Sequence, residues 1–430
     1  MFSKIPLMFK SGGFSLLIAC LVGCGGNAPP GNASTNASTT DVSVSGNSFT
    51  LNGATWIPKA FNIAGFVSTP AYLSQLSSQA KYNGYIADTM CGPELFTAIK
   101  RWGADTVRIF VSQYYLNPVS VNDQFYDANY FNDVVSIISQ ARDNDLVVVI
   151  AMQDEEESGG PRFHGLPTTE TLENWLALNE VFGGDQGVMY ELYNEPTQGD
   201  PKVPPSLEDW MLWLNGGTAY YPPGMEVSFT AIGMQTIINA LRSAGSTNTF
   251  VLDGLALATT LNGLNALPTP VTDPLNRVGY GIHQYLQQGT VTQSDWESNF
   301  GQFSRTLPIF VDEWFACANT KPGLLGLDSY QLAVDFLNYL QTKRIGVGGW
   351  AIDVAGYMVN DVPEPGNCSA GWQQPSYYAG FDPLTMPIGD AGILIINDFL
   401  SGYNRMLVPA DGTTLYQQPP PTYPAIPCST

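Results

Sequence analysis

The chain has 430 residues, a formal net charge of −21 and only two histidines, and these totals exclude several classes of function. A strongly acidic protein does not bind nucleic acid or an anionic lipid surface through its charge. His164 and His283 are too few for a histidine-rich metal site, so we predict no metal and no cofactor. Aromatic residues make up 12% of the chain and charged residues 13%, a combination that suits an uncharged polar ligand.

The first 41 residues are typical of an export signal followed by a tether. Residues 1–23 combine two lysines with an apolar run that is too short for a permanent membrane helix. The sequence that ends at Cys24 resembles a bacterial lipobox, so residues 1–23 are expected to be a lipoprotein signal peptide and Cys24 to carry the lipid. The alternative is an ordinary signal peptide with an incidental cysteine. Residues 24–41, rich in Gly, Asn, Ser and Thr, are expected to form a flexible tether.

These features predict an exported bacterial lipoprotein. It would be anchored to a membrane through Cys24 alone and would face outward from the outer membrane or cell surface.

From Val42 onward, short apolar strands alternate with amphipathic helices. A hairpin over residues 42–44 and 49–51 is expected to cap one end of the domain. The expected strands then cover residues 59–63, 106–110, 146–152, 188–193, 249–253, 278–282, 309–311 and 346–351. The expected helices cover residues 93–102, 131–144, 169–182, 230–244, 295–305, 329–343 and 389–401.

This alternation predicts an α/β fold, a single (β/α)8 TIM barrel with long βα loops over residues 42–430. An open doubly wound sheet is the alternative, but no glycine-rich phosphate loop follows the first strand. Four cysteines lie in this domain, namely Cys91, Cys317, Cys368 and Cys428. They allow two disulfides with three possible pairings. We favour Cys317 with Cys368, because both are expected in neighbouring loops on one face of the barrel.

Polar and aromatic residues occupy the expected carboxyl-terminal ends of successive strands, where such a barrel carries its chemistry. They are Arg108 in the second strand, Gln153 and Asp154 after the third, Asn194 and Glu195 after the fourth, His283 and Tyr285 after the sixth, Asp312 and Glu313 after the seventh, and Trp350 in the eighth. Each one alone has a structural explanation, such as an ion pair for Arg108 or a core position for Trp350. Their occurrence at the same end of successive strands favours a single site.

Two of these residues, Glu195 and Glu313, are a pair of carboxylates without metal ligands or a phosphate loop, which suits glycoside hydrolysis. That reaction needs one carboxyl group protonated and the other ionised. Arg108 beside Glu313 is expected to keep that carboxylate charged. Glu195, in a drier setting near a second negative charge, is expected to have a raised pKa and to act as the acid. Trp350 offers a flat apolar face to a sugar ring.

These motifs resemble those of glycoside hydrolase family 5, a clan A family of cellulase-like barrel enzymes with carboxylates on strands four and seven. The resemblance rests on residues 191–196, 282–285, 308–314 and 107–109, and it covers about residues 56–400. It implies a retaining mechanism in which Glu313 is the nucleophile and Glu195 is the acid/base. The two carboxyl groups are then expected about 5–5.5 Å apart.

The resemblance also implies supporting roles. Asn194 would hold the sugar 2-hydroxyl, Tyr285 and Arg108 would position Glu313, and His283 would hydrogen-bond near the acid/base. The family often has a histidine at the end of strand three, where this chain has Gln153 and Asp154. His164 is expected to lie too far along the loop to replace it. Asp312, directly before Glu313, also departs from the small residue that is more usual there.

Aromatic residues in two long loops suit a cleft for a polysaccharide or oligosaccharide. They are Trp210, Trp213, Tyr220 and Tyr221 after strand four, and Tyr357, Trp372, Tyr377, Tyr378 and Phe381 after strand eight. They either pack the loops internally or line the cleft. We predict a monomeric, retaining endo-glycoside hydrolase that cleaves β-1,4-linked glucan. The alternative is an endo-β-1,4-mannanase or another β-glycanase of the same family. A surface lipoprotein that binds glycans without cutting them is the alternative of a different class.

Overall fold

The computed structural model describes residues 40–65, 92–116, 126–154, 164–200, 203–220, 228–286, 292–315, 329–352, 358 and 390–401. All of these residues belong to one unit of the chain, Ser38–Thr430. The expected leader, all six cysteines and the aromatic residues predicted after strand eight lie outside the described residues. Among the described helices, none combines the length and the apolar composition that a membrane crossing requires.

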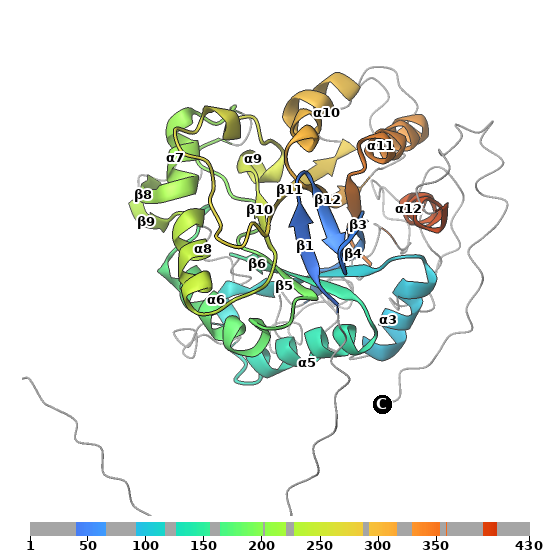
Figure 1. The fold of residues 1–430 in the computed structure, drawn as a ribbon, viewed down its shortest axis with the longest axis horizontal. Coiled ribbons are helices and arrows are strands. Elements are labelled where there is room, and N and C mark those ends of the chain that lie inside the picture. Colours follow the sequence, from blue (N-terminus) through green and yellow to red (C-terminus); the bar gives the residue numbers. More distant parts are fainter. Residues whose placement is uncertain are drawn as a thin grey trace, which may run out of the picture. The chain divides into compact units, whose positions relative to one another are not determined.

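Eight parallel strands close into a barrel (Figure 1). They are β4 (Lys59–Ile63), β5 (Thr106–Ser112), β6 (Val147–Gln153), β7 (Val188–Glu191), β10 (Phe250–Asp253), β11 (Val278–Tyr285), β12 (Ile309–Phe315) and β13 (Gly346–Gly349). Each strand pairs with the next one in chain order, and β13 pairs with β4 to close the ring. Every residue of β5, β6 and β12 is buried, as expected for parallel strands covered by helices. The predicted (β/α)8 barrel is confirmed.

Helices alternate with these strands and surround them in Figure 1. They are α3 (Gly92–Arg101), α4 (Gln113–Leu116), α5 (Tyr130–Asp143), α6 (Thr169–Phe182), α8 (Met234–Ser243), α9 (Leu255–Ala258), α10 (Gln293–Asn299), α11 (Ser329–Lys343) and α12 (Asp390–Ser401). In α5 the buried residues Val134, Ile137, Ile138 and Ala141 recur at helical spacing, so one face packs on the barrel. Helices α6 and α11 match their predicted bounds.

A three-stranded antiparallel sheet covers the amino-terminal end of the barrel strands. It consists of β1 (Val42–Ser45), β2 (Ser48–Leu51) and β3 (Ala54–Trp56). Val42 donates its N–H to the carbonyl of Gln186 at 3.0 Å and accepts a hydrogen bond from Thr249 Oγ1 at 2.7 Å. Gln186 lies two residues before β7 and Thr249 directly before β10, so the predicted hairpin does cap the barrel, with β3 as an additional strand. The opposite end of the barrel remains for chemistry.

The segment after β7 differs from the prediction. The helix expected over residues 230–244 begins only at Met234, because residues Ser228–Ile232 form β9, which pairs with β8 (Gly216–Tyr220). Helix α7 (Leu207–Asn215) precedes this hairpin. Gly233 separates β9 from α8, and a Cβ atom there would lie 2.2 Å from the carbonyl oxygen of Leu214. This close approach of two backbones requires glycine and sets the start of the helix.

Candidate active site

Strand β12 carries one more residue than either neighbour at the site. From Gly281 to His283 strand β11 advances by two residues, while the paired residues of β12 run from Phe310 to Glu313. The pairing with β13 shifts at the same place, between Val311 and Trp314. A bulge of this kind interrupts the alternation of side chains. The consecutive residues Asp312 and Glu313 are consequently both buried, at 0% and 2% exposure.

Arg108, fully buried in β5, holds the site together through its guanidinium group. Its Nη1 donates to Glu313 Oε1 at 2.7 Å and to Asn62 Oδ1 at 2.9 Å, and its Nη2 donates to Asn194 Oδ1 at 2.6 Å. Nε and Nη2 both donate to the carboxylate of Glu191. Burial opposes the charge, but the carboxylates of Glu191 and Glu313 raise the pKa of Arg108 well above its ordinary value. The guanidinium therefore stays charged and fixes the carboxylates around it.

Glu195, four residues beyond the end of β7, and Glu313, inside β12, approach each other. One carboxylate oxygen of each lies within 4.8 Å of the other and of a ring nitrogen of His283. The Glu195 side chain is 29% exposed and that of Glu313 is 3% exposed. The upper bound of 4.8 Å is shorter than the roughly 6.5–9.5 Å between the carboxyl groups of inverting glycosidases, and it agrees better with the separation of about 5–5.5 Å in retaining ones.

The surroundings make these two carboxyl groups unequal. Burial raises the pKa of Glu195 to about 7, with Arg108 opposing the shift. Burial also raises the pKa of Glu313, but His283, Arg108 and a hydrogen bond from Tyr285 oppose that shift. The Tyr285 hydroxyl donates to Glu313 Oε2, and because burial raises the pKa of Tyr285 the hydroxyl keeps its proton. Glu313 thus has two donors that stabilise its charge, while Glu195 is poised to carry a proton near neutral pH.

His283 lies between the two glutamates and a pair of aspartates. Its Nδ1 is 3.0 Å from Glu195 Oε1 and 3.4 Å from Glu313 Oε2. Its Nε2 is 3.4 Å from Asp253 Oδ2 and 3.6 Å from Asp312 Oδ1. Burial lowers the pKa of His283 to about 4, although Glu313 pulls it upward. At neutral pH the ring is therefore uncharged and carries a single proton on one of its two nitrogens.

The remaining predicted residues join the same site. Gln153 ends β6 and accepts a hydrogen bond from Asn194 Nδ2, so Asn194 connects Gln153 with Arg108. Trp350 directly follows β13 rather than lying in it. It packs edge-on against Phe110, with 5.0 Å between the ring centroids, and the guanidinium of Arg108 lies 4.3 Å from the Phe110 ring. The structure thus brings Gln153 and Asn194 to the site of the two glutamates, and Trp350 reaches Arg108 through Phe110.

Asp154 and His164 form a neighbouring cluster at the end of β6. Asp154 Oδ2 accepts a hydrogen bond from the His164 backbone N–H at 2.8 Å and lies 2.9 Å from His164 Nδ1. Tyr193 Oη donates to the same oxygen at 3.0 Å, and Gln113 Nε2 donates to Oδ1 at 2.9 Å. His164 therefore lies nearer to the end of β6 than its place in the loop suggests, while Gln153 is the β6 residue that contacts Asn194.

The sequence matches the family model described as cellulase (glycosyl hydrolase family 5) over residues 67–356. This chain belongs to glycoside hydrolase family 5. It is similar to the manganese dependent endoglucanase Eg5A of Phanerodontia chrysosporium, with 23% identity over 57% of this chain and 59% of that protein. It is also similar to a mannan endo-1,4-beta-mannosidase of Cellvibrio japonicus (strain Ueda107), with 25% identity over 51% of this chain and 43% of that protein. The chain thus spans about half the length of these relatives.

A solved structure shares the fold of this family 5 chain. It is a beta-glucanase, SdGluc5_26A from Saccharophagus degradans, with a TM-score of 0.55 and 17% identity. The likeness covers 85% of this chain and 94% of that one, so it extends over most of both barrels.

Sequence reasoning gave no role to three buried residues of the site in this family 5 barrel, Asn62, Glu191 and Asp253. Asn62 receives a hydrogen bond from Arg108, Glu191 pairs with the same guanidinium, and Asp253 accepts the backbone N–H of Glu195 at 3.1 Å. The available signal was a carboxylic acid inside an otherwise apolar strand. A buried acid needs a partner, just as buried Arg108 does.

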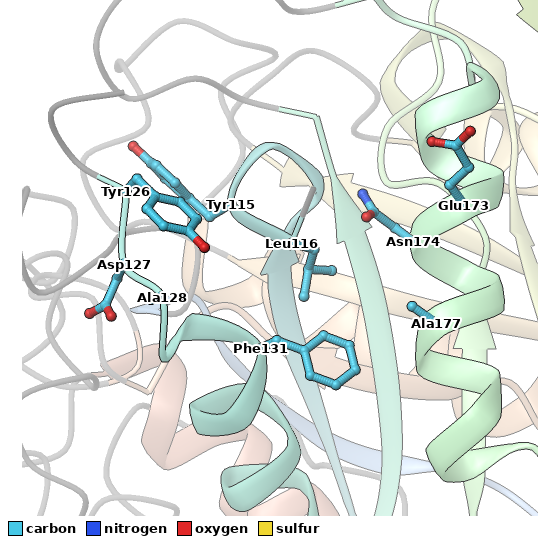
Figure 2. A pocket seen from close by; sticks show the side chains of 9 residues that line it. All are labelled: Tyr115, Leu116, Tyr126, Asp127, Ala128, Phe131, Glu173, Asn174 and Ala177. Carbon is cyan, nitrogen blue, oxygen red and sulfur yellow. The ribbon is translucent and has the colours of Figure 1, made fainter. Parts of the chain in front are cut away.

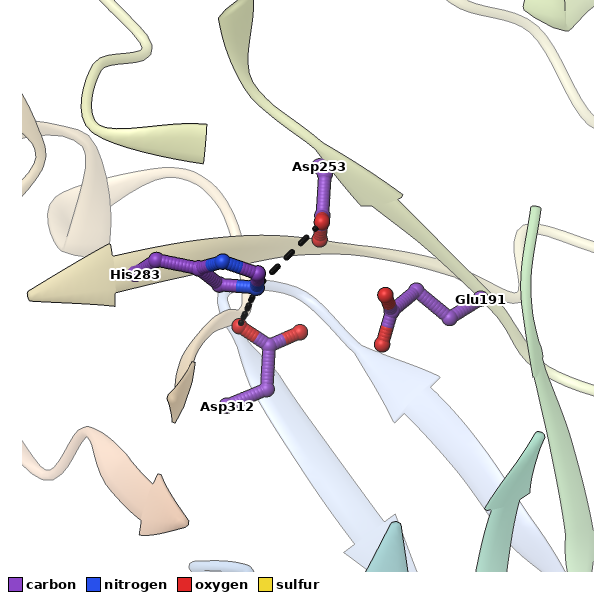
Figure 3. Close-up of side chains that lie close together, drawn as sticks. All are labelled: Glu191, Asp253, His283 and Asp312. Atoms are coloured by element: carbon purple, nitrogen blue, oxygen red, sulfur yellow. Dashed lines mark ion pairs between the residues drawn. The ribbon is translucent and has the colours of Figure 1, made fainter. Parts of the chain in front are cut away.

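Four of the buried residues also have the composition of a metal site. Glu191, Asp253, His283 and Asp312 each offer a ligand atom within 4.8 Å of the others, and Figure 3 shows the two aspartates on either side of His283 Nε2. The guanidinium of Arg108, however, takes both oxygens of Glu191 and lies 3.4 Å from His283 Nε2. A fixed positive charge at that place repels a metal cation, so we assign no metal to this group.

A separate hollow lies outside the barrel, between α4, the start of α5 and the middle of α6 (Figure 2). It has a volume of about 510 Å³ and is lined by Tyr115, Leu116, Tyr126, Asp127, Ala128, Phe131, Glu173, Asn174 and Ala177. This lining includes neither Glu195 nor Glu313, so the hollow is not the carboxylate site.

Proposed function

We propose that this family 5 chain is a monomeric, retaining endo-glycoside hydrolase that cleaves β-1,4-linked glucan. The observation that carries the proposal is the pair Glu195 and Glu313, with carboxylate oxygens within 4.8 Å and unequal exposure. Carboxylates this close leave too little space for the additional water that an inverting enzyme places between them, which favours retention.

The reaction then proceeds in two displacements. Glu313 attacks the anomeric carbon while Glu195 gives its proton to the departing glycosidic oxygen, which leaves a glycosyl ester on Glu313. That ester removes the negative charge of Glu313, and the loss of a nearby charge lowers the pKa of Glu195. Glu195 next takes a proton from water as the water oxygen attacks the anomeric carbon. The sugar is released with its original configuration, and Glu313 is free again.

The neighbours of the two glutamates support this mechanism. Arg108 and Tyr285 donate hydrogen bonds to Glu313 and hold it ionised for attack. Asn194, held between Gln153 and Arg108, is placed to bind the sugar 2-hydroxyl. Trp350, half-buried beside Phe110, offers a ring face to the sugar, and His283 contacts the acid/base at 3.0 Å.

The aromatic residues of the loop after β7 contribute less to substrate binding than their number suggests. Trp210 and Trp213 are 1% and 0% exposed, and Trp213 donates its indole N–H to the carbonyl of Asp253 at 3.0 Å. They pack this loop internally. Tyr220, at 54% exposure, presents its ring to solvent. Among the described aromatic residues of this loop, Tyr220 is therefore the one available for stacking on a glycan.

The substrate proposal is tested with a panel of glycans. Purified Ser38–Thr430 would be incubated with carboxymethyl cellulose, glucomannan, galactomannan and xylan, and both reducing ends and solution viscosity would be followed. We expect the highest rate on carboxymethyl cellulose, with viscosity falling early because an endo-acting enzyme cuts within the chain. A higher rate on galactomannan would support the mannanase alternative. Glycan binding without release from any of the four would support the non-catalytic alternative.

The pKa of Glu195 predicts the alkaline side of the activity profile. A general acid works only while it is protonated, so activity is expected to fall as pH rises through the Glu195 pKa of about 7. The measurement is kcat/KM against pH for the parent and for Glu195→Gln. The variant is expected to lose roughly 10²–10⁴-fold in rate and to lose the alkaline decline. An unchanged alkaline decline in the variant would assign it to another group.

We further propose that the chain is exported and anchored through a lipid on Cys24, as its leader predicts. In a bacterial host, labelled fatty acid is expected to be incorporated into the full-length chain and the chain to be found in the membrane fraction. Cys24→Ser should lose both the label and the membrane association. Membrane association that survives the substitution would argue against this anchor.

A further inference from the structure

The interior of the barrel holds more carboxyl groups than cations. Arg108 pairs with Glu191 and Glu313. Asp253 and Asp312 are also 0% exposed, and the basic side chain within 4 Å of both is His283, which is uncharged at neutral pH because burial lowers its pKa to about 4. An ionised carboxylate buried without a cation costs several kcal/mol or more. These two aspartates therefore need another way to reduce their charge.

Each aspartate uses one oxygen and leaves the other unsatisfied. Asp253 Oδ2 accepts the backbone N–H of Glu195 at 3.1 Å, and Asp312 Oδ1 accepts that of Ile282 at 3.0 Å. Asp253 Oδ1 and Asp312 Oδ2 are buried and have no hydrogen-bond partner among the described residues. Both converge on Gly281, where a Cβ atom would lie 2.1 Å from the first and 2.4 Å from the second. The two unsatisfied oxygens thus face the same small space.

We propose that Asp253 and Asp312 share one proton between these two oxygens, and that the resulting acid–carboxylate pair positions both Glu195 and Glu313. The proton forms an O–H···O⁻ hydrogen bond that satisfies both oxygens and removes one negative charge. Gly281 is required because any side chain there would occupy the space in which the two oxygens meet.

The aspartate pair is linked to both glutamates. Asp253 holds the backbone of Glu195, a non-glycine residue with φ of +51°, a conformation that persists only where the surroundings fix it. Asp312 lies next to Glu313 on the bulge of β12. A hydrogen bond between the aspartates therefore joins the backbone of the proposed acid/base to that of the proposed nucleophile. This role rests on the function proposed above for the two glutamates.

The charged groups around the pair agree with one retained proton. Burial raises the pKa of both aspartates well above the ordinary value, Glu191 from β7 adds to the shift, and Arg108 from β5 opposes it. His283 from β11 faces both aspartates, and Glu313 from β12 adds to the shift of Asp312. Because the folded-state pKa values are raised, the pair stabilises the fold at low pH, and this stabilisation is lost as pH rises through them.

Asparagine substitutions test the shared proton, because the backbone donors decide which atom of the amide faces the other aspartate. In Asp253→Asn the amide oxygen keeps the N–H of Glu195, so the NH₂ group faces Asp312 and donates to it. Asp312→Asn gives the reverse arrangement through Ile282. In the double variant two NH₂ groups face each other and neither accepts. In either single variant the NH₂ group therefore takes the place of the shared proton as donor, whereas the double variant has no hydrogen bond between the two side chains.

The thermal midpoint of the purified chain would be measured from pH 5 to 9 for the parent, both single variants and the double variant. The parent midpoint is expected to fall toward alkaline pH more steeply than that of either single variant, whose hydrogen bond needs no titrating proton. At pH 6 the double variant is expected to have a lower midpoint than either single variant. This readout is independent of activity, so it stands even if the proposed roles of Glu195 and Glu313 fail.

Kinetics test the positioning role. The double variant is expected to lose on the order of 10²-fold in kcat with a much smaller change in KM, since misplaced groups impair the chemical step more than binding. Each single variant should retain more kcat than the double variant. Asp273→Asn is the matched control, because it removes a carboxylate paired with Arg242 away from the site. Its loss of stability should leave kcat unchanged.

Two results would overturn the proposal. The first is single variants that are as destabilised as the double variant, which would mean that both carboxylates are needed ionised. The second is a parent midpoint raised by added Mn²⁺ and lowered by EDTA, with the effect lost in both single variants. That outcome would place a cation rather than a proton between the aspartates.

Discussion

Glu313→Ala is expected to abolish the release of reducing ends from every glycan that the parent cleaves. The substitution removes the nucleophile, and with it the glycosyl ester through which the reaction is proposed to pass. Arg108 and Tyr285 lose an acceptor, but both can retain other contacts or reach solvent in the enlarged site. Reducing-end release from the preferred glycan would be measured for the parent, the variant and Glu180→Ala. Glu180 lies exposed on α6, so its variant is the matched control and should retain the parental rate.

A reaction with azide distinguishes the roles of the two glutamates. The substrate is an aryl β-glycoside whose leaving group needs no protonation, and the configuration of the glycosyl azide product is determined. In Glu313→Ala, azide occupies the space of the missing carboxylate and attacks the substrate directly, which gives an α-glycosyl azide. In Glu195→Ala, the ester still forms on Glu313 and azide displaces it, which gives a β-glycosyl azide. A β product from Glu313→Ala would exchange the two assignments. Full cleavage of glycan by Glu313→Ala would reject this carboxylate pair as the catalytic one.

Arg108→Met is expected to combine a large loss of stability with a shifted pH profile. Methionine retains much of the buried volume but leaves Glu191 and Glu313 without their cation, and removing one partner from a buried ion pair costs about 3–5 kcal/mol. Arg108 also opposes the raised pKa of Glu313, so that pKa should rise further. Since a nucleophile must be ionised, the acidic side of the kcat/KM profile should move to higher pH. Urea unfolding and a pH series of initial rates measure the two effects.

Arg242→Met provides the matched control for that experiment. The Arg242 side chain is 6% exposed, pairs with Asp273 at 2.7 Å and lies 3.8 Å from the ring centroid of Phe250, but it takes no part in the carboxylate site. Its variant should lose stability and keep the parental pH profile. If Arg108→Met and Arg242→Met differ in stability alone, Arg108 does not control the ionisation of the glutamates.

Hydrophobic periodicity predicted the order of the barrel elements, but the predicted ends of two strands are wrong because polar residues lie inside those strands. The expected sixth and seventh strands end at residues 282 and 311, where His283 and Asp312 interrupt the apolar runs. In the structure β11 continues to Tyr285 and β12 to Phe315. Polar side chains remain inside these strands because Arg108 and the backbone N–H of Ile282 supply them with partners. Such long-range partners are invisible in a local pattern.

That Glu195 and Glu313 lie close together could be predicted from sequence, whereas the buried aspartates could not be grouped with them. Glu195 and Glu313 belong to short motifs that can each be recognised from a few consecutive residues. Asp253 joins the site only because β10 lies beside β11 in the barrel, and Asp312 faces inward only because β12 carries an additional residue. The bulge in β12 becomes visible only in its pairing with both neighbouring strands, and a pattern read along one strand does not contain that pairing.

The additional residue in β12 also limits how barrels of this kind can be recombined. A closed ring of strands has no free edge at which a change in register can be absorbed, so a strand without the extra residue would offset every side chain beyond that point. Replacing β12 by a strand without the additional residue would turn either Asp312 or Glu313 outward, even if both residues were retained. Recombining homologous barrels should therefore succeed at this position only when donor and recipient both carry the additional residue. The shape of the backbone, and not only the identity of the residues, must be the same in both.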